Sequence, residues 1–517
     1  MMMQENEFVA FFTNPFFLIA VIFWTAVLIL IKVLGHFKKA KALSVFFPFL
    51  AMIKTTRLNR LLRKIALKSP RTWKLIFTAG IFVSFCFTIY GFGYFSWNLI
   101  RLILSLVYGQ QPPPETQVTP LVPGLTIDFN TFTYLIIPIL LVLTVHEFSH
   151  AVSANADDIP VKSTGVLGMG VFFIIGFGAF VEIDEKAYKR GRYSGWQKTR
   201  MAAAGSFSNA FLALIAFILV LNFTSVVSLS WGAPNALSIK NVYTSAQGGY
   251  NEGILYPGDV LFAINGTTIA SVDLDLSAYL GHVHPGSNLS CTILRNGMNQ
   301  TILVRTGFSP AGYNQSVAFI GIQSEPWWPP RDWFGNWLGG LFPNTLQVEI
   351  FWLWTISISV TIFNMMPVPI FDGDKVVYEL INHFIKARKE KRMVTEKFTI
   401  GKDSKTYELA RMSVEGEHGI TLLPDPKYPE AHAIELAEHQ DYQFTDSDGD
   451  GRFDHVTFEL SDKDLAGKTV EIGYTAEVDS KEKLKQRILN IIRVISLAII
   501  LGNFIISAFT LGFKLPF

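Results

Sequence analysis

The sequence is poor in charged residues, which make up 17% of its 517 positions. Soluble domains usually carry about a quarter charged residues, so this deficit excludes an ordinary soluble protein. Half of the residues are hydrophobic and the mean hydropathy is +0.32, which indicates a polytopic membrane protein. The two cysteines, Cys86 and Cys291, are too few for a disulfide scaffold or a thiolate zinc site. Nothing in the composition indicates a nucleic-acid partner.

Acidic residues are absent from residues 32–74, which contain twelve Lys or Arg. Short basic loops stay in the cytoplasm, so we expect this loop inside the cell, between a first span at 15–34 and a second at 75–96 that extends towards Val107. The length of the first run and its polar, acidic start disfavour a signal peptide. Residues 43–53 are too short to span, and we expect them either at the membrane interface or as a loop over the helices.

Four further apolar stretches are long enough to cross a bilayer core of about 30 Å. We predict spans at about 131–154, 201–226, 348–367 and 488–511. Asn209 in the fourth span is expected to make a packing hydrogen bond. The Gly-punctuated residues 165–181 favour a re-entrant hairpin or loop over a further short span, which would invert the topology downstream. The expected fold class is therefore an α-helical polytopic membrane protein with about six transmembrane helices and a re-entrant element.

Three ionisable side chains interrupt the third span, which reads IPILLVLTVHEFSHAVSA at residues 137–154. Ionisable groups in hydrocarbon are costly and indicate a functional site. On a helix, residues i and i+4 share a face, so His146 and His150 can bind one metal ion. Glu147 then lies beside that ion, where a carboxylate can take a proton from a bound water. The pattern predicts a metal centre within the membrane, near the cytoplasmic face.

A third metal ligand is predicted at Asp372, in the segment FNMMPVPIFDGDK. Pro367 and Pro369 end the fifth span just before this residue. A carboxylate fixed at a broken helix end, at the depth of the histidines, is what a third zinc ligand requires. The alternative is a helix terminator followed by an exposed aspartate, and the histidine pair in the third span favours the ligand.

Residues 230–323 have the composition of a soluble domain, with short β-like runs between Pro-Gly and Asn-Gly turns. The stretch resembles a PDZ domain in its pattern of a Gly, then G-D-x-L, then I-N-G. The matching residues are Gly253, Gly258, Asp259, Leu261, Ile264, Asn265 and Gly266. PDZ domains bind extended peptides by strand addition, and a structural spacer is the alternative.

A second soluble stretch, of mixed charged and β-like sequence, contains an Asp-rich segment. Asp446, Asp448, Asp450 and Asp454 stand at the spacing of an EF-hand calcium loop. The twelfth position of that loop is Thr457 instead of Glu, and cytosolic calcium is scarce. We therefore favour a turn rich in Asp and Gly, with a Ca²⁺ site as the alternative.

The order of these motifs resembles that of the site-2 protease family of intramembrane zinc metalloproteases. The H-E-x-x-H helix is followed by N-x-x-P-x-P-x-x-D-G, from Asn364 to Gly373, with the PDZ-like stretch inserted between them. The resemblance covers a core from about Thr131 to Gly373. One departure is Gly205-Ser206, where many members of the family have Gly-Pro.

The resemblance implies a zinc endopeptidase that cleaves transmembrane segments of other proteins in regulated intramembrane proteolysis, usually after prior trimming. Zn²⁺ would be held by His146, His150 and Asp372, with Glu147 as general base. Asn364 would bind the unwound substrate, and backbone capping is its alternative role. Single-span membrane proteins are the expected substrates, and an upstream protease of the site-1 type is an expected partner. A non-proteolytic metal-binding adaptor or pseudoprotease that uses its PDZ-like domain is the alternative function.

The predicted organisation follows from these spans and motifs, with the PDZ-like domain placed outside the cytoplasm. It comprises an N-terminal membrane region with two spans and a basic loop (1–130), the first part of the catalytic membrane core (131–229), the PDZ-like domain (230–324), an aromatic linker with the fifth span and third ligand (325–380), a cytoplasmic soluble domain (381–486) and a C-terminal span (487–517).

Overall fold

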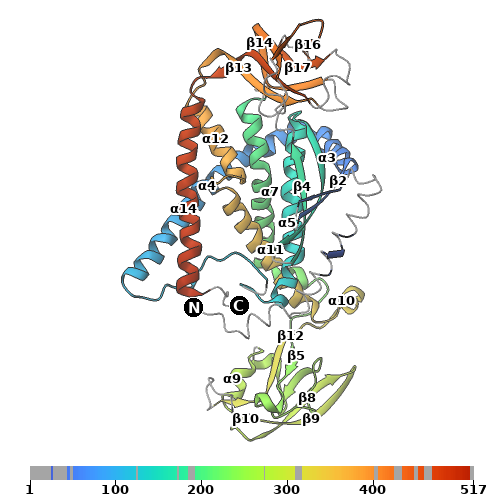
Figure 1. The fold of residues 1–517 in the computed structure, drawn as a ribbon. Coiled ribbons are helices and arrows are strands. Elements are labelled where there is room, and N and C mark those ends of the chain that lie inside the picture. Colours follow the sequence, from blue (N-terminus) through green and yellow to red (C-terminus); the bar gives the residue numbers. More distant parts are fainter. Residues whose placement is uncertain are drawn as a thin grey trace. The chain divides into compact units, whose positions relative to one another are not determined.

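The computed structural model divides into two compact units, residues 1–211 with 356–517 and residues 212–355, and each is described by itself (Figure 1). The described residues are 22, 25–26, 29, 43–46, 50–123, 126–171, 174–183, 193–272, 274–308, 317–400, 406–423, 433–446, 452–458 and 468–512.

Five helices in the described part of the chain are long and apolar enough to cross a membrane. They are α4 (Pro70–Val107), α5 (Phe129–Ala156), α7 (Gly195–Leu221), α11 (Phe342–Asn364) and α14 (Glu482–Leu511). These helices coincide with the second to sixth expected spans. The first expected span, at 15–34, lies almost wholly outside the described residues. The chain is therefore an integral membrane protein with several spans.

Shorter helices connect or flank the spans. Several helices begin at residues that are typical of helix N-termini. Pro70 opens α4 at a position where its missing N–H is not needed. Asp332 and Asp275 accept hydrogen bonds from backbone amides at the starts of α10 and α9. The short helices are α3 (Thr56–Lys68), α8 (Phe223–Val227), α9 (Leu276–Leu280), α10 (Trp333–Leu338) and α12 (Asp372–Phe384).

A four-stranded antiparallel sheet lies beside α5, with the order β1-β2-β3-β4. Its strands are β1 (Leu43–Phe46), β2 (Leu50–Thr55), β3 (Val161–Val171) and β4 (Ile174–Ile183). The described residues of 165–181 thus lie in two antiparallel strands and not in a helical span, while the re-entrant placement of this hairpin stays a prediction. Residues 43–46 and 50–53 lie in strands and not in a loop, because β2 pairs with β3 and so satisfies its backbone groups. The expected place of this segment at the membrane interface stays a prediction.

Unit 212–355 contains a sheet with the order β12-β5-β6-β8-β9, in which β7 also pairs with β6. Asn265 and Gly266, of the I-N-G pattern, both have positive φ (49° and 81°) and form the tight turn between β6 and β7. The carboxylate of Asp259 receives two hydrogen bonds from Arg295, at 2.6 and 2.8 Å. The strands are β5 (Ala236–Val242), β6 (Val260–Ile264), β7 (Thr267–Thr268), β8 (Asn288–Arg295), β9 (Met298–Arg305), β10 (Gly307–Phe308), β11 (Ala318–Phe319) and β12 (Ile322–Trp327).

The second soluble stretch folds as a sheet with the order β13-β18-β14-β17-β16, with β15 paired to β14. Its buried core includes Val456, Ile472 and Tyr474. The strands are β13 (Lys389–Thr399), β14 (Thr406–Leu422), β15 (Ile434–Leu436), β16 (Tyr442–Thr445), β17 (Phe453–Phe458) and β18 (Thr469–Asp479).

In each of these two sheets, the strand by which the chain enters pairs antiparallel with the strand by which it leaves. In the second sheet, β13 follows α12 and pairs over its whole length with β18, which precedes α14. In the other unit, β5 and β12 pair from Ala236 and Trp327 onwards. The helices α12 and α14 are in turn joined by Arg493, which donates two hydrogen bonds of 2.6 Å to Asp374, and they lie side by side in Figure 1.

Candidate metal centre

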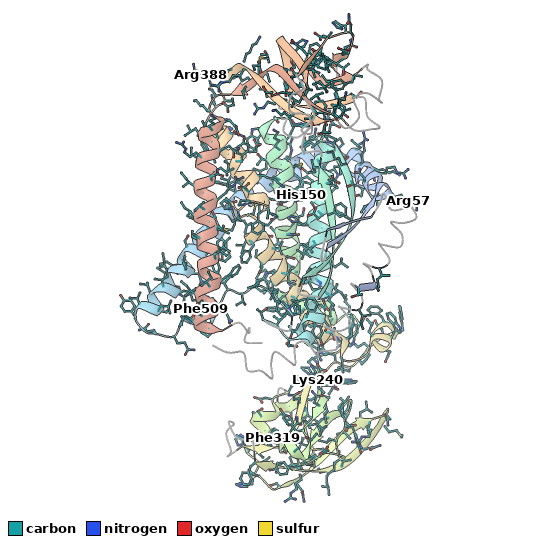
Figure 2. All side chains as sticks on the ribbon, in the orientation of Figure 1. Arg57, His150, Lys240, Phe319, Arg388 and Phe509 are labelled. Carbon is teal, nitrogen blue, oxygen red and sulfur yellow. The ribbon has the colours of Figure 1, made fainter. Side chains whose placement is uncertain are left out.

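Three predicted ligands converge at one point inside the helical unit. His146 and His150 lie one turn apart on α5, and Asp372 is the first residue of α12. The two Nε2 atoms are 3.1 Å apart, and Asp372 Oδ2 lies 3.2 Å from His146 Nε2 and 2.9 Å from His150 Nε2. All three side chains are buried, and His150 lies among the helices in Figure 2. The structure thus brings the three predicted residues together in a group that could hold a metal ion, and their role as ligands stays a prediction.

The hydrogen bonds behind the histidines show that this group suits a cation. His150 Nδ1 lies 2.7 Å from the carbonyl oxygen of Met201 and donates to it, so in the neutral ring the lone pair of Nε2 points at Asp372. Two imidazole lone pairs and a carboxylate within 3.2 Å of one another repel unless a cation lies between them. Tetrahedral zinc with such ligands separates their donor atoms by roughly 3.3 Å. The donor set therefore suits Zn²⁺.

Asn209 of α7 contacts His146 on the side of the ring that faces away from Asp372. Its side-chain amide lies 3.0 Å from His146 Nδ1, and its Oδ1 has no partner in the described structure. Amide oxygen and nitrogen are assigned from the hydrogen-bond network. We orient the amide with Oδ1 towards Nδ1–H, because that tautomer leaves the lone pair of His146 Nε2 free for a metal.

The position of Asp372 is fixed by a strained, close-packed turn between α11 and α12. Ile370 has φ of 90° although it is not a glycine. At Gly373, a Cβ would lie 2.2 Å from the carbonyl oxygen of Met365, so only glycine allows this approach. Lys375 Nζ donates to Asp372 Oδ1 at 3.3 Å, and Oδ2 is the oxygen that faces the two histidines.

Glu147 lies beside the hairpin. Its Oε2 accepts a hydrogen bond of 3.1 Å from the backbone N–H of Val181 on β4. Strand β4 has β3 on one side and is an edge strand within the described sheet. The predicted general base is thus anchored to the edge of the β-hairpin.

Asn364, the last residue of α11, lies against the ligands. Its Nδ2 donates to Asp372 Oδ2 at 2.7 Å and to Ser206 Oγ at 3.2 Å, and lies 3.1 Å from His146 Nε2. The backbone N–H of Asp372 points back to Asn364 Oδ1 at 3.4 Å. The predicted substrate-binding residue is therefore at the metal centre, and its side chain also stabilises the turn that carries Asp372.

Sequence reasoning missed two contributors on α7. Asn209 was expected only to pack, and Gly205 was noted only because of the residue that follows it. Gly205 lies so close that an added Cβ would be 2.5 Å from His150 Nε2 and 2.6 Å from His146 Nε2. The run of small residues at 201–206, MAAAGS, was the available signal, because it allows α7 to approach α5 closely.

Replacing Asn209 with leucine is expected to weaken zinc affinity by about 10–100-fold, since a hydrogen-bond partner behind a ligating histidine typically contributes that much. The measurement is competition with a chromogenic chelator on the purified protein. Asn209→Asp should keep most of the affinity, because it still accepts from Nδ1–H. Equal affinity of the leucine variant and the parent would contradict the assigned role.

The Asp-rich segment lies between β16 and β17, which pair as an antiparallel hairpin. Asp448 and Asp450 lie outside the described residues. Asp454 is buried in β17 and accepts from His455 at 2.8 Å. Strands flank this loop where an EF-hand has helices, so the setting is that of a turn, and the Ca²⁺ alternative stays a prediction.

Comparison with known proteins adds three findings. The family described as Peptidase family M50 matches residues 134–400. An uncharacterized protein of Methanocaldococcus jannaschii is 26% identical over 306 residues, which is 57% of this chain and 68% of that protein. The PDZ domain of an SdrC-like protein from Listeria monocytogenes matches 18% of this chain and 86% of that domain, at 16% identity and a TM-score of 0.14.

Proposed function

Since this chain belongs to Peptidase family M50, we propose that it is a zinc endopeptidase that cleaves transmembrane segments of other proteins within the bilayer. The observation that carries the proposal is the convergence of His146, His150 and Asp372 within 3.2 Å of one another, on or beside helices of membrane-spanning length. Glu147 follows directly on His146 in the same helix.

Each residue then has a chemical role. Zn²⁺ held by His146, His150 and Asp372 would supply a Lewis acid, which lowers the pKa of a water to about 7. Glu147 accepts the proton of the attacking water and passes it to the leaving amine. Asn364, whose Nδ2 lies among the ligands, donates to the carbonyl oxygen as it gains charge.

A transmembrane helix hides its carbonyl groups in internal hydrogen bonds, so the substrate must unwind before attack. The edge of β4 supports this step, because its Val181 N–H faces Glu147. An unwound segment that pairs with this edge would pass close to the general base. In this proposal the hairpin β3–β4 enters the membrane beside α5.

The topology and partners are also proposals, supported by the basic loop at 32–74. The metal centre lies near the cytoplasmic face, and the PDZ-like domain lies on the opposite side. That domain would screen the extracytoplasmic parts of single-span substrates and admit those already trimmed by a protease of the site-1 type. Regulated intramembrane proteolysis is the process that these parts would serve.

Cleavage of a single-span model substrate by the purified full chain in detergent tests the proposal. We expect cleavage that is abolished by a zinc chelator and restored when zinc is added back. The products, located by mass spectrometry, should end within the transmembrane segment. Cleavage that persists without metal would overturn the zinc mechanism. No cleavage, with one zinc bound per chain and a trimmed substrate, would overturn the endopeptidase in favour of a metal-binding adaptor.

A further inference from the structure

A cavity of about 560 Å³ lies between α4, α7 and α12, lined by residues other than the metal ligands. From α4 it is lined by Ile81, Phe82 and Phe85, and from α12 by Val376 and Leu380. Phe82 is 71% exposed, so in the membrane this side meets lipid. The cavity therefore offers an apolar channel that opens to the bilayer.

Polar groups gather at one end of the same cavity. Trp196 is the second residue of α7, and Asn382 and His383 come near the end of α12. The indole of Trp196 lies edge-on to the ring of His383, with ring centres 6.3 Å apart. The lining thus changes from polar at the start of α7 and the end of α12 to apolar further along, which is the profile of an amphiphile with a headgroup and a chain.

The charged groups at the polar end of the cavity indicate which kind of lipid headgroup the cavity could bind. Of the described residues that line the cavity, Glu379 is the one carboxylic acid, and it is 8% exposed. A carboxylate has about four acceptor positions, and Asn382 Nδ2 donates to Glu379 Oε2 at 3.3 Å. Burial raises the pKa of Glu379 above its usual range, and Lys198 and Lys485, which do not line the cavity, oppose this rise by favouring the carboxylate.

We propose that this cavity binds a membrane lipid whose headgroup carries an ammonium group. The ammonium donates to Glu379 and lies near the indole of Trp196, which attracts cations. The acyl chain follows Ile81, Phe82 and Phe85 along α4. The site is distinct from the metal centre and does not depend on the proposed proteolysis.

The site also contacts the element that carries the third metal ligand. Val376 lines the cavity and packs with Met365 in one buried cluster, one turn after Asp372 on α12. A bound lipid therefore adds contacts that hold α12 against α4 and α7.

Native mass spectrometry of the full chain tests the proposal, with dioleoyl phosphatidylethanolamine and dioleoyl phosphatidylglycerol offered in equal amounts. We expect the ethanolamine lipid to be retained about tenfold better, the preference that one charge-assisted hydrogen bond provides. Glu379→Gln should remove the preference, and Leu380→Trp, which fills the cavity, should remove retention of both lipids. Ile103→Trp, on an exposed face of α4 outside the cavity, should change nothing.

Zinc content and a single elution peak establish that each variant is folded. If a variant does not fold, the comparison of the two lipids on the unmodified chain tests the proposal. Equal retention of the two lipids, or a preference that persists in Glu379→Gln, would show that Glu379 does not select the headgroup and would overturn the proposal. Retention of neither lipid by the unmodified chain would overturn the proposal equally.

Discussion

Replacing Glu147 with glutamine is expected to lower the cleavage rate by about 10²–10⁴-fold, the usual contribution of a general base, while one zinc per chain remains. Glutamine has nearly the same size, and its carbonyl oxygen can still accept from the Val181 N–H that now bonds to Glu147. It cannot accept the proton of the attacking water. The loss should appear in kcat for a single-span substrate, and zinc content by mass spectrometry should stay unchanged.

Glu349→Gln is the matched control for this prediction. Glu349 is also a glutamate within an apolar helix, α11, and its Oε2 is buried, but the proposed mechanism gives it no role. Its variant should cleave at the parental rate. Undiminished cleavage by Glu147→Gln would remove the general-base assignment, and loss of zinc together with activity would give Glu147 a structural role instead.

Replacing Gly205 with alanine is expected to empty the metal centre and abolish cleavage. The added Cβ would lie 2.5 Å from His150 Nε2 and 2.6 Å from His146 Nε2, well inside van der Waals contact. The rings cannot rotate away without breaking their bonds to Met201 and Asn209. Either α7 moves away from α5 or the histidines leave their positions, and both separate the ligands.

Zinc stoichiometry after dialysis against a weak chelator measures this effect, and we expect it to fall well below one per chain. Gly93→Ala on α4 is the control, since a Cβ there meets no atom within 4 Å, and alanine is the better helix former. Normal zinc content and activity in Gly205→Ala would show that the two helices separate more readily than their contacts indicate.

The grouping of His146, Glu147 and His150 could be predicted from the sequence because its geometry is local. His146, Glu147 and His150 share one helix, and helical periodicity alone places the histidines on one face. Asp372 required more, since only the order of the motifs connected it to the histidines. The turn that positions it depends on the positive φ of Ile370, which the two neighbouring prolines do not predict.

The residues behind the ligands could not be predicted, because their contacts are long-range. Asn209 reaches His146 across 63 positions, and a polar residue in a span is equally consistent with packing. The pairing of β2 with β3 joins Leu50 to Met169, and short apolar runs separated by so much chain carry no signal of a shared sheet. The sequence of β2 read alone therefore indicated only a segment too short to span.

The paired strands at the base of each soluble domain bear on how such a chain is assembled. Lys389 faces Asp479, and Ala236 faces Trp327, as direct cross-strand partners, so each domain begins and ends at one place. The strand pair therefore sets the distance between the two points where the chain enters and leaves each domain. A change of length inside either domain leaves that distance unchanged, so it need not disturb the metal centre formed by α5, α7 and α12.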